Sequence, residues 1–156
     1  GEILTKGMNV MDGYYNNPEA SNAVLSPDGW LHTGDLGILD PDGYLYIKGR
    51  SKSLILGPSG QNIYPEEIED LLNAQPYIAE SLVIEREGKL VALVYPDSEA
   101  MKQHKISRDT LLKIIHETRK QINQQIPAYS QIARIEIHDE EFEKTPKRSI
   151  KRFLYQ

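Results

Sequence analysis

The sequence contains no cysteine, and this absence excludes several classes of protein at once. Without cysteine the chain can form no disulfide framework, no thiolate nucleophile and no cysteine-ligated zinc site. Long apolar runs are also missing, since none approaches the roughly 18 residues that a membrane-spanning helix requires. Basic residues are in the minority, with 18 Lys and Arg against 23 Asp and Glu and a formal net charge of −5. This balance disfavours a general nucleic-acid-binding protein, which would present a basic face.

The remaining composition is that of an ordinary globular protein, with 39% hydrophobic and 26% charged residues. A chain of 156 residues is expected to hold about one domain, or one domain and part of another. No basic segment followed by an apolar one opens the sequence, so no signal peptide is predicted. These features predict a cytoplasmic protein whose core needs neither disulfides nor a structural metal.

Residues 1–50 carry mainly strand and turn signals. The opening GEILTKG predicts a strand with no partner nearby, which suggests a domain whose beginning is missing. Leu36–Leu39 and Tyr44–Lys48 alternate in polarity around the turn sequence Asp40-Pro41-Asp42-Gly43, so they predict a hairpin. Small and charged residues at 49–53 then interrupt the strand pattern, and we expect a domain boundary there.

Residues 51–156 predict a compact α+β unit, in which a small mixed sheet packs against helices. The expected elements are short strands around residues 53–56 and 61–64, a helix from Pro65, a hairpin of residues 79–86 and 89–95, a helix capped by Ser107, a strand at 132–137 and a terminal helix at 149–155.

Two apolar faces follow from these elements. In the hairpin we expect one side to hold Leu82, Ile84, Leu90, Ala92 and Val94. In the helix after Ser107 we expect a stripe of Leu111, Ile115, Thr118 and Ile122, widened by Leu112 and Ile114.

Three segments place charged residues or glycines where a ligand could be bound. Asp35 lies in the Thr-Gly-Asp turn of GWLHTGDLG, where a carboxylate could accept both hydroxyls of a ribose, although such an Asp equally often caps its own turn. Arg50 follows a strand in DGYLYIKGRSKSLI, and its planar guanidinium suits phosphate or ribose oxygens. The third segment, GQNIYPEEIE, opens with a glycine loop. His32 is interpreted as a polar surface residue.

Together the three segments closely resemble the late motifs of the adenylate-forming acyl-CoA synthetase superfamily, which joins carboxylic acids to coenzyme A through an acyl-AMP. The resemblance implies that Asp35 and Arg50 bind ATP and AMP, and that Lys52 is the hinge of a domain rotation. It further implies that Gly60, Gln61 and Asn62 border the channel for the pantetheine of CoA.

The same resemblance implies a domain organisation and a set of cofactors. Residues 1–50 would be the β-rich end of a large N-terminal domain, and residues 51–156 a small, mobile C-terminal lid. ATP, CoA and Mg²⁺ are the implied cofactors, with the Mg²⁺ ligands upstream of this chain. The implied partners are the carboxylic acid and the missing N-terminal domain. The chain alone is therefore expected to bind ATP poorly and to turn over no substrate.

The basic segment Lys144–Arg152 departs from the superfamily pattern. Ser149 occupies the position at which a catalytic lysine is usual, and serine supplies no positive charge for phosphate and carboxylate. Three explanations stay open: Lys147 or Lys151 substitutes by a local shift, adenylation is slow or altered, or the arrangement is unusual. Of these we favour local substitution.

The substrate class is suggested by the end of the chain, where FEKTP and IKRFLY look most like bacterial long-chain fatty-acid CoA ligases. The function predicted on this basis is a long-chain fatty-acid CoA ligase that forms AMP. Adenylation of an amino acid or aryl acid is the alternative within the superfamily. A non-catalytic interaction domain, and an anion-binding module that uses the basic tail, are alternatives from other classes.

Overall fold

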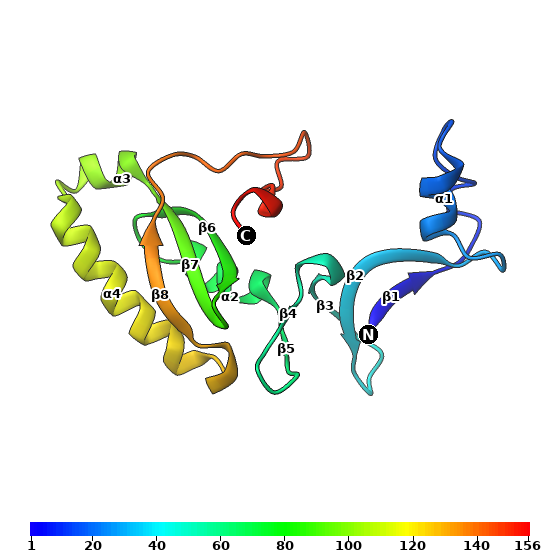
Figure 1. Cartoon of the computed structure of the whole chain (residues 1–156), viewed down its shortest axis with the longest axis horizontal. Helices are drawn as coiled ribbons and strands as arrows, with labels where there is room; N and C mark the ends of the chain where they lie inside the picture. The colour runs from blue at the N-terminus through cyan, green and yellow to red at the C-terminus, as the bar shows by residue number, and fades with distance from the viewer. The chain divides into compact units, whose positions relative to one another are not determined.

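The computed structural model describes all of residues 1–156. The chain divides into two compact units, Gly1–Ser53 and Leu54–Gln156, shown from blue to cyan and from green to red in Figure 1. That residues 1–50 end a larger domain stays a prediction. No helix combines the length and apolar character needed to cross a bilayer.

The first unit is built on a three-stranded antiparallel sheet in the order β1-β2-β3. Its strands are β1 (Glu2–Thr5), β2 (Leu31–Leu39) and β3 (Leu45–Arg50). The β2–β3 hairpin confirms the prediction from the turn signal. The expectation that the first strand lacks a partner is wrong, because β1 pairs with β2 and places Leu4 opposite His32. That partner lies some thirty residues along the chain, so local inspection of the sequence misses it.

The short helix α1 (Pro18–Val24) completes the first unit and begins where the Asn-Pro signal places it. The Asn17 side chain accepts a hydrogen bond from the Ala20 amide at 3.0 Å. Proline suits the first helical position because an N–H there would have no partner within the helix. No apolar side chain before Ile63 is buried, and the hairpin leaves large side chains such as Leu39 and Ile47 exposed.

The second unit contains a three-stranded mixed sheet in the order β6-β7-β8. The strands are β6 (Ile78–Arg86), β7 (Lys89–Pro96) and β8 (Ile132–Ile137). β6 and β7 are antiparallel, whereas β8 runs parallel to β7. A two-stranded sheet of β4 (Ile55–Leu56) and β5 (Asn62–Ile63) precedes them. The predicted α+β class with a mixed sheet and packed helices is confirmed.

The helices of this unit are α2 (Pro65–Asn73), α3 (Ser98–Gln103) and α4 (Arg108–Gln125). Ser107 caps α4 as predicted, accepting a hydrogen bond from the Thr110 amide at 3.2 Å. Helix α3, which Asp97 caps, was not foreseen. The predicted terminal helix is wrong. Lys144 and Ile150 form an isolated antiparallel bridge, which leaves only a 3₁₀ turn at Arg152–Leu154.

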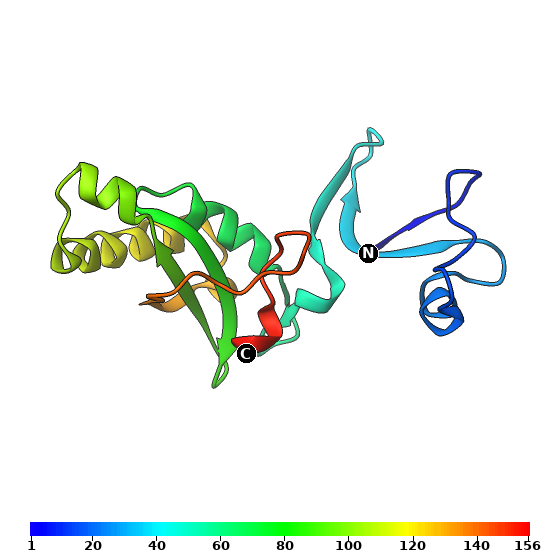
Figure 2. The same cartoon turned by 90° about the horizontal axis from the view of Figure 1, so that it is seen from above.

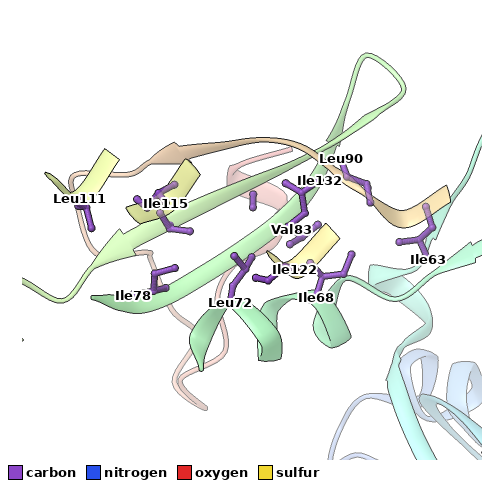
Figure 3. Close-up of a cluster of buried hydrophobic side chains, with 12 residues drawn as sticks. Ile63, Ile68, Leu72, Ile78, Val83, Leu90, Leu111, Ile115, Ile122 and Ile132 are labelled. Carbon is purple, nitrogen blue, oxygen red and sulfur yellow. The ribbon is translucent and has the colours of Figure 1, made fainter. Parts of the chain in front are cut away.

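The main core lies between the sheet and the helices α2 and α4 (Figure 3). The buried stripe on α4 is the predicted one, Leu111, Ile115, Thr118 and Ile122. Leu112 does not widen it, since its side chain is 49% exposed. Ile63 of β5 belongs to this core as well, so the loop that precedes β5 is anchored to the body of the domain.

The prediction for the β6–β7 hairpin is partly wrong. Leu82 and Ile84 pair with Leu93 and Val91 on the opposite face from Leu90, Ala92 and Val94. The two-residue turn at Glu87-Gly88 sets this register, and apolar residues on both faces leave no alternation in the sequence to reveal it. The second face packs against Phe142 of the C-terminal tail, on the other side of the sheet from α4 (Figure 2).

Candidate functional site

The Thr-Gly-Asp turn in β2 is held by contacts to the first strand. Gly34 has a φ of +73°, a left-handed conformation that favours glycine. The Asp35 amide donates to Thr33 Oγ1 at 3.1 Å, and that hydroxyl donates to the Ile3 carbonyl at 2.7 Å. Glu2 Oε1 accepts a hydrogen bond from the Gly34 amide at 3.1 Å. The backbone beside the Asp35 carboxylate is therefore fixed by specific bonds.

Asp35 and Arg50 are brought together by the pairing of β2 with β3, where they lie opposite one another. Arg50 Nε is 2.9 Å from Asp35 Oδ1, while the side chains remain 65% and 32% exposed. A carboxylate acceptor and a guanidinium donor are thus presented side by side to solvent. The polar surface role expected for His32 agrees with its exposed position, where Nδ1 lies 2.9 Å from Glu2 Oε2.

Lys52 is exposed and lies in the 3₁₀ turn Ser51–Ser53, the last residues of the first unit. No helix or strand ladder continues through this turn. Its role as a hinge remains a prediction.

The glycine loop between β4 and β5 is a tight turn. The Gly60 amide donates to the Gly57 carbonyl at 2.9 Å, and the Gly57 amide donates to the Gln61 carbonyl at 2.8 Å. Gly60 has a φ of +79° and open space where a Cβ would lie. Within this chain, glycine is therefore required at position 60 by the turn conformation and not by close packing. Asn62 is exposed beside it.

Gln61 borders a groove of about 580 Å³ in the second unit. The β4–β5 turn forms one side, Gly88 with the first two residues of β7 another, and residues 128–133 a third. Its lining is mostly apolar and includes Ile55, Leu56 and Tyr129. Gly60 and Asn62 do not line it, so of the three residues predicted at the CoA channel only Gln61 faces this groove.

The basic segment forms a second loop, the tail hairpin, which we define as residues 144–150. The Thr145 amide donates to the Ser149 carbonyl, and the Arg148 amide donates to the Thr145 carbonyl, both at 2.8 Å. Lys147 and Arg148 are exposed at its tip, and Arg148 has a φ of +61°. Ser149 is exposed on the returning arm.

The three residues considered for the catalytic position differ in their surroundings. Lys151 Nζ forms an ion pair with Glu143, and its amide donates to the Glu143 carbonyl at 2.9 Å. Lys147, in contrast, makes no ion pair and extends from the tip of the tail hairpin. The ammonium group that is free to meet an anionic ligand is therefore that of Lys147, whereas Lys151 is already neutralised.

The base of the tail hairpin is tied to the sheet by charged groups. Lys144 Nζ lies 2.6 Å from Glu80 Oε1 of β6 and 2.5 Å from Glu141 Oε1. The hydrogen bonds to Glu141 and Glu80 raise the pKa of Lys144. Two residues beyond the hairpin, Arg152 forms an ion pair with Glu69 of α2.

Sequence reasoning missed the residues that hold these loops in place, namely Glu2, Thr33 and Glu69. The sequence does signal Arg152, which ends the basic run. Nothing in it pairs Arg152 with a glutamate more than 80 residues earlier.

A metal site is not among the features of this chain. Nowhere in residues 1–156 do three or more His, Asp or Glu side chains gather in an arrangement that could hold a metal ion. The predicted Mg²⁺ ligands remain a prediction about residues outside the chain.

A protein-family model described as "AMP-binding enzyme C-terminal domain" matches residues 52–155. The chain belongs to this family. The matched C-terminal domain includes both the glycine loop and the tail hairpin, and it excludes Asp35 and Arg50.

Two curated relatives match a large part of the chain. An indoleacetate–CoA ligase from Aromatoleum aromaticum is 51% identical over 98 residues, which cover 60% of this chain and 19% of the relative. A 2-succinylbenzoate–CoA ligase from Bacillus cereus is 48% identical over 84 residues, or 54% of this chain and 17% of the relative. The matched region is thus about a fifth of each relative's length.

A solved structure resembles the whole chain. The O-succinylbenzoate coenzyme A synthetase (MenE) of Bacillus subtilis, in complex with AMP, superposes with a TM-score of 0.73 at 31% identity. The match covers 100% of this chain and 30% of the synthetase chain. The similarity therefore extends to residues 1–51, which precede the C-terminal domain.

Proposed function

We propose that this chain is the C-terminal part of an ATP-dependent ligase that converts a carboxylic acid to an acyl-AMP and then to an acyl-CoA. The observation that carries the proposal is the family match over residues 52–155, together with identities of 51% and 48% to two CoA ligases. Residues 1–50 would then end the large domain, with residues 51–156 as the mobile lid.

An aryl acid is the substrate class that the relatives favour. Both curated relatives carry names of acids with an aromatic ring, indoleacetate and 2-succinylbenzoate. The predicted long-chain fatty acid finds support only in the FEKTP and IKRFLY segments, and these lie in the lid and not in an acyl pocket. We therefore place the aryl acid first and retain the fatty acid as the second candidate.

In the first half-reaction, a carboxylate oxygen attacks the α-phosphorus of ATP and pyrophosphate leaves. Asp35, as an acceptor beside Arg50, would hold the ribose hydroxyls, because hydrogen bonds to a charged carboxylate are short and strong. Lys147, at the exposed tip of the tail hairpin, would supply the positive charge that Ser149 lacks. Mg²⁺, held by residues outside this chain, would neutralise the phosphate charge.

In the second half-reaction, the CoA thiol attacks the acyl carbonyl, loses its proton, and AMP leaves. The glycine loop would then border the pantetheine arm, with Gln61 at the edge of the apolar groove. Rotation at Lys52 would exchange the tail hairpin for the glycine loop at the reaction centre.

Acid-dependent ATP–pyrophosphate exchange by the full-length protein tests the proposal. We expect exchange with aryl acids such as indoleacetate or 2-succinylbenzoate, and CoA-dependent product formation with the same acids. Exchange with long-chain fatty acids alone would overturn the aryl-acid assignment and keep the ligase. Absence of exchange across aryl, fatty and amino acids would refute the ligase and favour an interaction domain.

A further inference from the structure

Strand β6 has an open edge at Val83, where Arg152, which follows the tail hairpin, contacts the backbone. Since the sheet order is β6-β7-β8, β6 has a neighbour on one side only. The Val83 amide donates to Glu69 Oε1 at 2.6 Å, and the Val83 carbonyl accepts from Arg152 Nη1 at 3.2 Å. Arg152 Nη2 in turn donates to Glu69 Oε2. One carboxylate, one guanidinium and the backbone N–H and C=O of one residue thus close a ring of hydrogen bonds, which we call the edge ring.

The edge ring is more deeply buried than the other ion pairs of the chain. The side chains of Arg152 and Glu69 are 19% and 11% exposed, against 61% and 64% for the pair Arg108–Asp139. A buried ion pair stabilises one geometry only if its polar atoms are all bonded, and here each partner bonds the other and the strand edge. The ring therefore defines where Arg152 lies far more narrowly than an exposed pair could.

A second carboxylate, that of Glu66, lies near the edge ring. Glu66 Oε1, also on α2, lies 3.7 Å from Arg152 Nη2. Burial raises the pKa of Glu69, an effect that Arg152 and the Val83 amide oppose and the Glu66 charge increases. Arg152 thus opposes the effect of burial on the Glu69 carboxyl.

The ring joins the segment after the tail hairpin to helix α2, which is distant from it in sequence. Arg152 follows the tail hairpin by two residues, and Glu69 lies in α2, which begins directly after β5 and the glycine loop. At the other end of the tail hairpin, Phe142 is buried and Lys144 pairs with Glu80. The tail hairpin is therefore held at both ends. Lys144 holds it to Glu80 of β6 at one end, and the edge ring holds it to α2 at the other.

We propose that Arg152 and Glu69 are positioning residues, which fix the tail hairpin to the body of the C-terminal domain so that Lys147 is presented at a defined place. The structural part of this inference stands on the edge ring alone. Its consequence for adenylation rests on the proposed function.

Hydrogen exchange of the 156-residue chain tests the structural part. The amides of Thr145, Arg148 and Lys151 are hydrogen-bonded within the tail and report its opening. In Arg152→Gln and Glu69→Gln we expect their exchange to accelerate about tenfold or more, because local opening follows the loss of tertiary contacts. Amides of β7 should change much less.

The matched control is Arg108→Gln, which removes an arginine from an exposed pair in the same domain and should leave tail exchange unchanged. Unchanged tail exchange in Arg152→Gln would overturn the inference. Equal acceleration of the tail and β7 amides would also overturn it, because the ring would then serve only global stability.

Pyrophosphate exchange by the full-length protein tests the consequence for adenylation. In Arg152→Gln we expect kcat to fall about tenfold with KM for ATP nearly unchanged, since the hairpin but not the nucleotide contacts would be displaced. Arg152→Lys should recover part of the rate. A loosened tail with an unaltered kcat would overturn the positioning role. A wild-type protein without any exchange would instead defeat the proposed function and leave the hydrogen-exchange result intact.

Discussion

Arg50 lies directly opposite Asp35 on the neighbouring strand, with its Nε 2.9 Å from Asp35 Oδ1. The two residues lie on the two strands of a hairpin whose turn is predicted from the sequence. They are fifteen positions apart and meet because of the strand register. Because both side chains remain partly exposed, the pair contributes little to stability and is available to a ligand.

Asp35→Asn should weaken ATP binding by the full-length protein by about tenfold or more, because an amide replaces one charged acceptor with a donor. The affinity can be measured by isothermal titration calorimetry. His32→Gln is the control, since His32 is exposed in the same strand and pairs with Glu2. Equal ATP affinities of wild type and Asp35→Asn would show that Asp35 only caps its turn.

Lys147→Ala should slow acyl-AMP formation by about tenfold or more, because it removes the charge that we propose meets phosphate and carboxylate. Lys151→Ala should have a smaller effect, since Lys151 is paired with Glu143. Single-turnover formation of the acyl-adenylate measures both. If neither substitution slows the reaction, local replacement of the missing lysine is ruled out. Ser149→Lys should accelerate adenylation if the usual position is still functional.

Leu72→Ala should destabilise the chain by about 2–5 kcal/mol, because it leaves a cavity between α2 and the sheet. Leu72 is fully buried in the main core. Urea unfolding followed by circular dichroism gives the free energy of unfolding. Leu112→Ala on α4 is the matched control, and its side chain is 49% exposed, so its effect should stay below about 1 kcal/mol. Similar losses in both variants would contradict the assignment of the core.

Acid should destabilise the second unit partly through Glu136 of β8. Hydrogen bonding to Arg134, with a smaller effect of Arg86, lowers the pKa of Glu136 below its ordinary value of 4.5. A carboxyl whose pKa is lowered by folding stabilises the native state above the unfolded pKa, and this stability is lost as pH falls through the lowered pKa. Below pH 4.5 the wild type should therefore lose a contribution to its free energy of unfolding. Glu136→Gln does not have this contribution at any pH.

The measurement is the free energy of unfolding at pH 7 and at pH 3 for both proteins. The difference between the two pH values should be smaller in Glu136→Gln. Glu140→Gln removes the same charge from an exposed residue that makes no ion pair, and its pH dependence should match that of the wild type. A Glu136→Gln protein with the full wild-type pH dependence would contradict this prediction.

Elements with strong local signals were predictable from the sequence. Proline at position 65, serine at 107 and the helical spacing of Leu111, Ile115 and Ile122 place α2 and α4 where the structure has them. The hairpin that brings Asp35 to Arg50 likewise follows from its turn residues. The failures in the sheets, at β1 and at Leu82 and Ile84, concern which distant partner a strand selects and which of two apolar faces a side chain joins.

By itself, the sequence determined the starts of α1, α2 and α4, the hairpin turns, the α+β class and the superfamily motifs, because caps, turn residues and periodicity act over a few neighbouring positions. Only the tertiary structure decided that Lys151 is paired and Lys147 is free, that the tail forms a hairpin and not a helix, and that Arg152 meets Glu69 at the edge of β6. These outcomes depend on burial and on partners far along the chain, since a charge acquires its role only once folding has placed its counter-charge beside it.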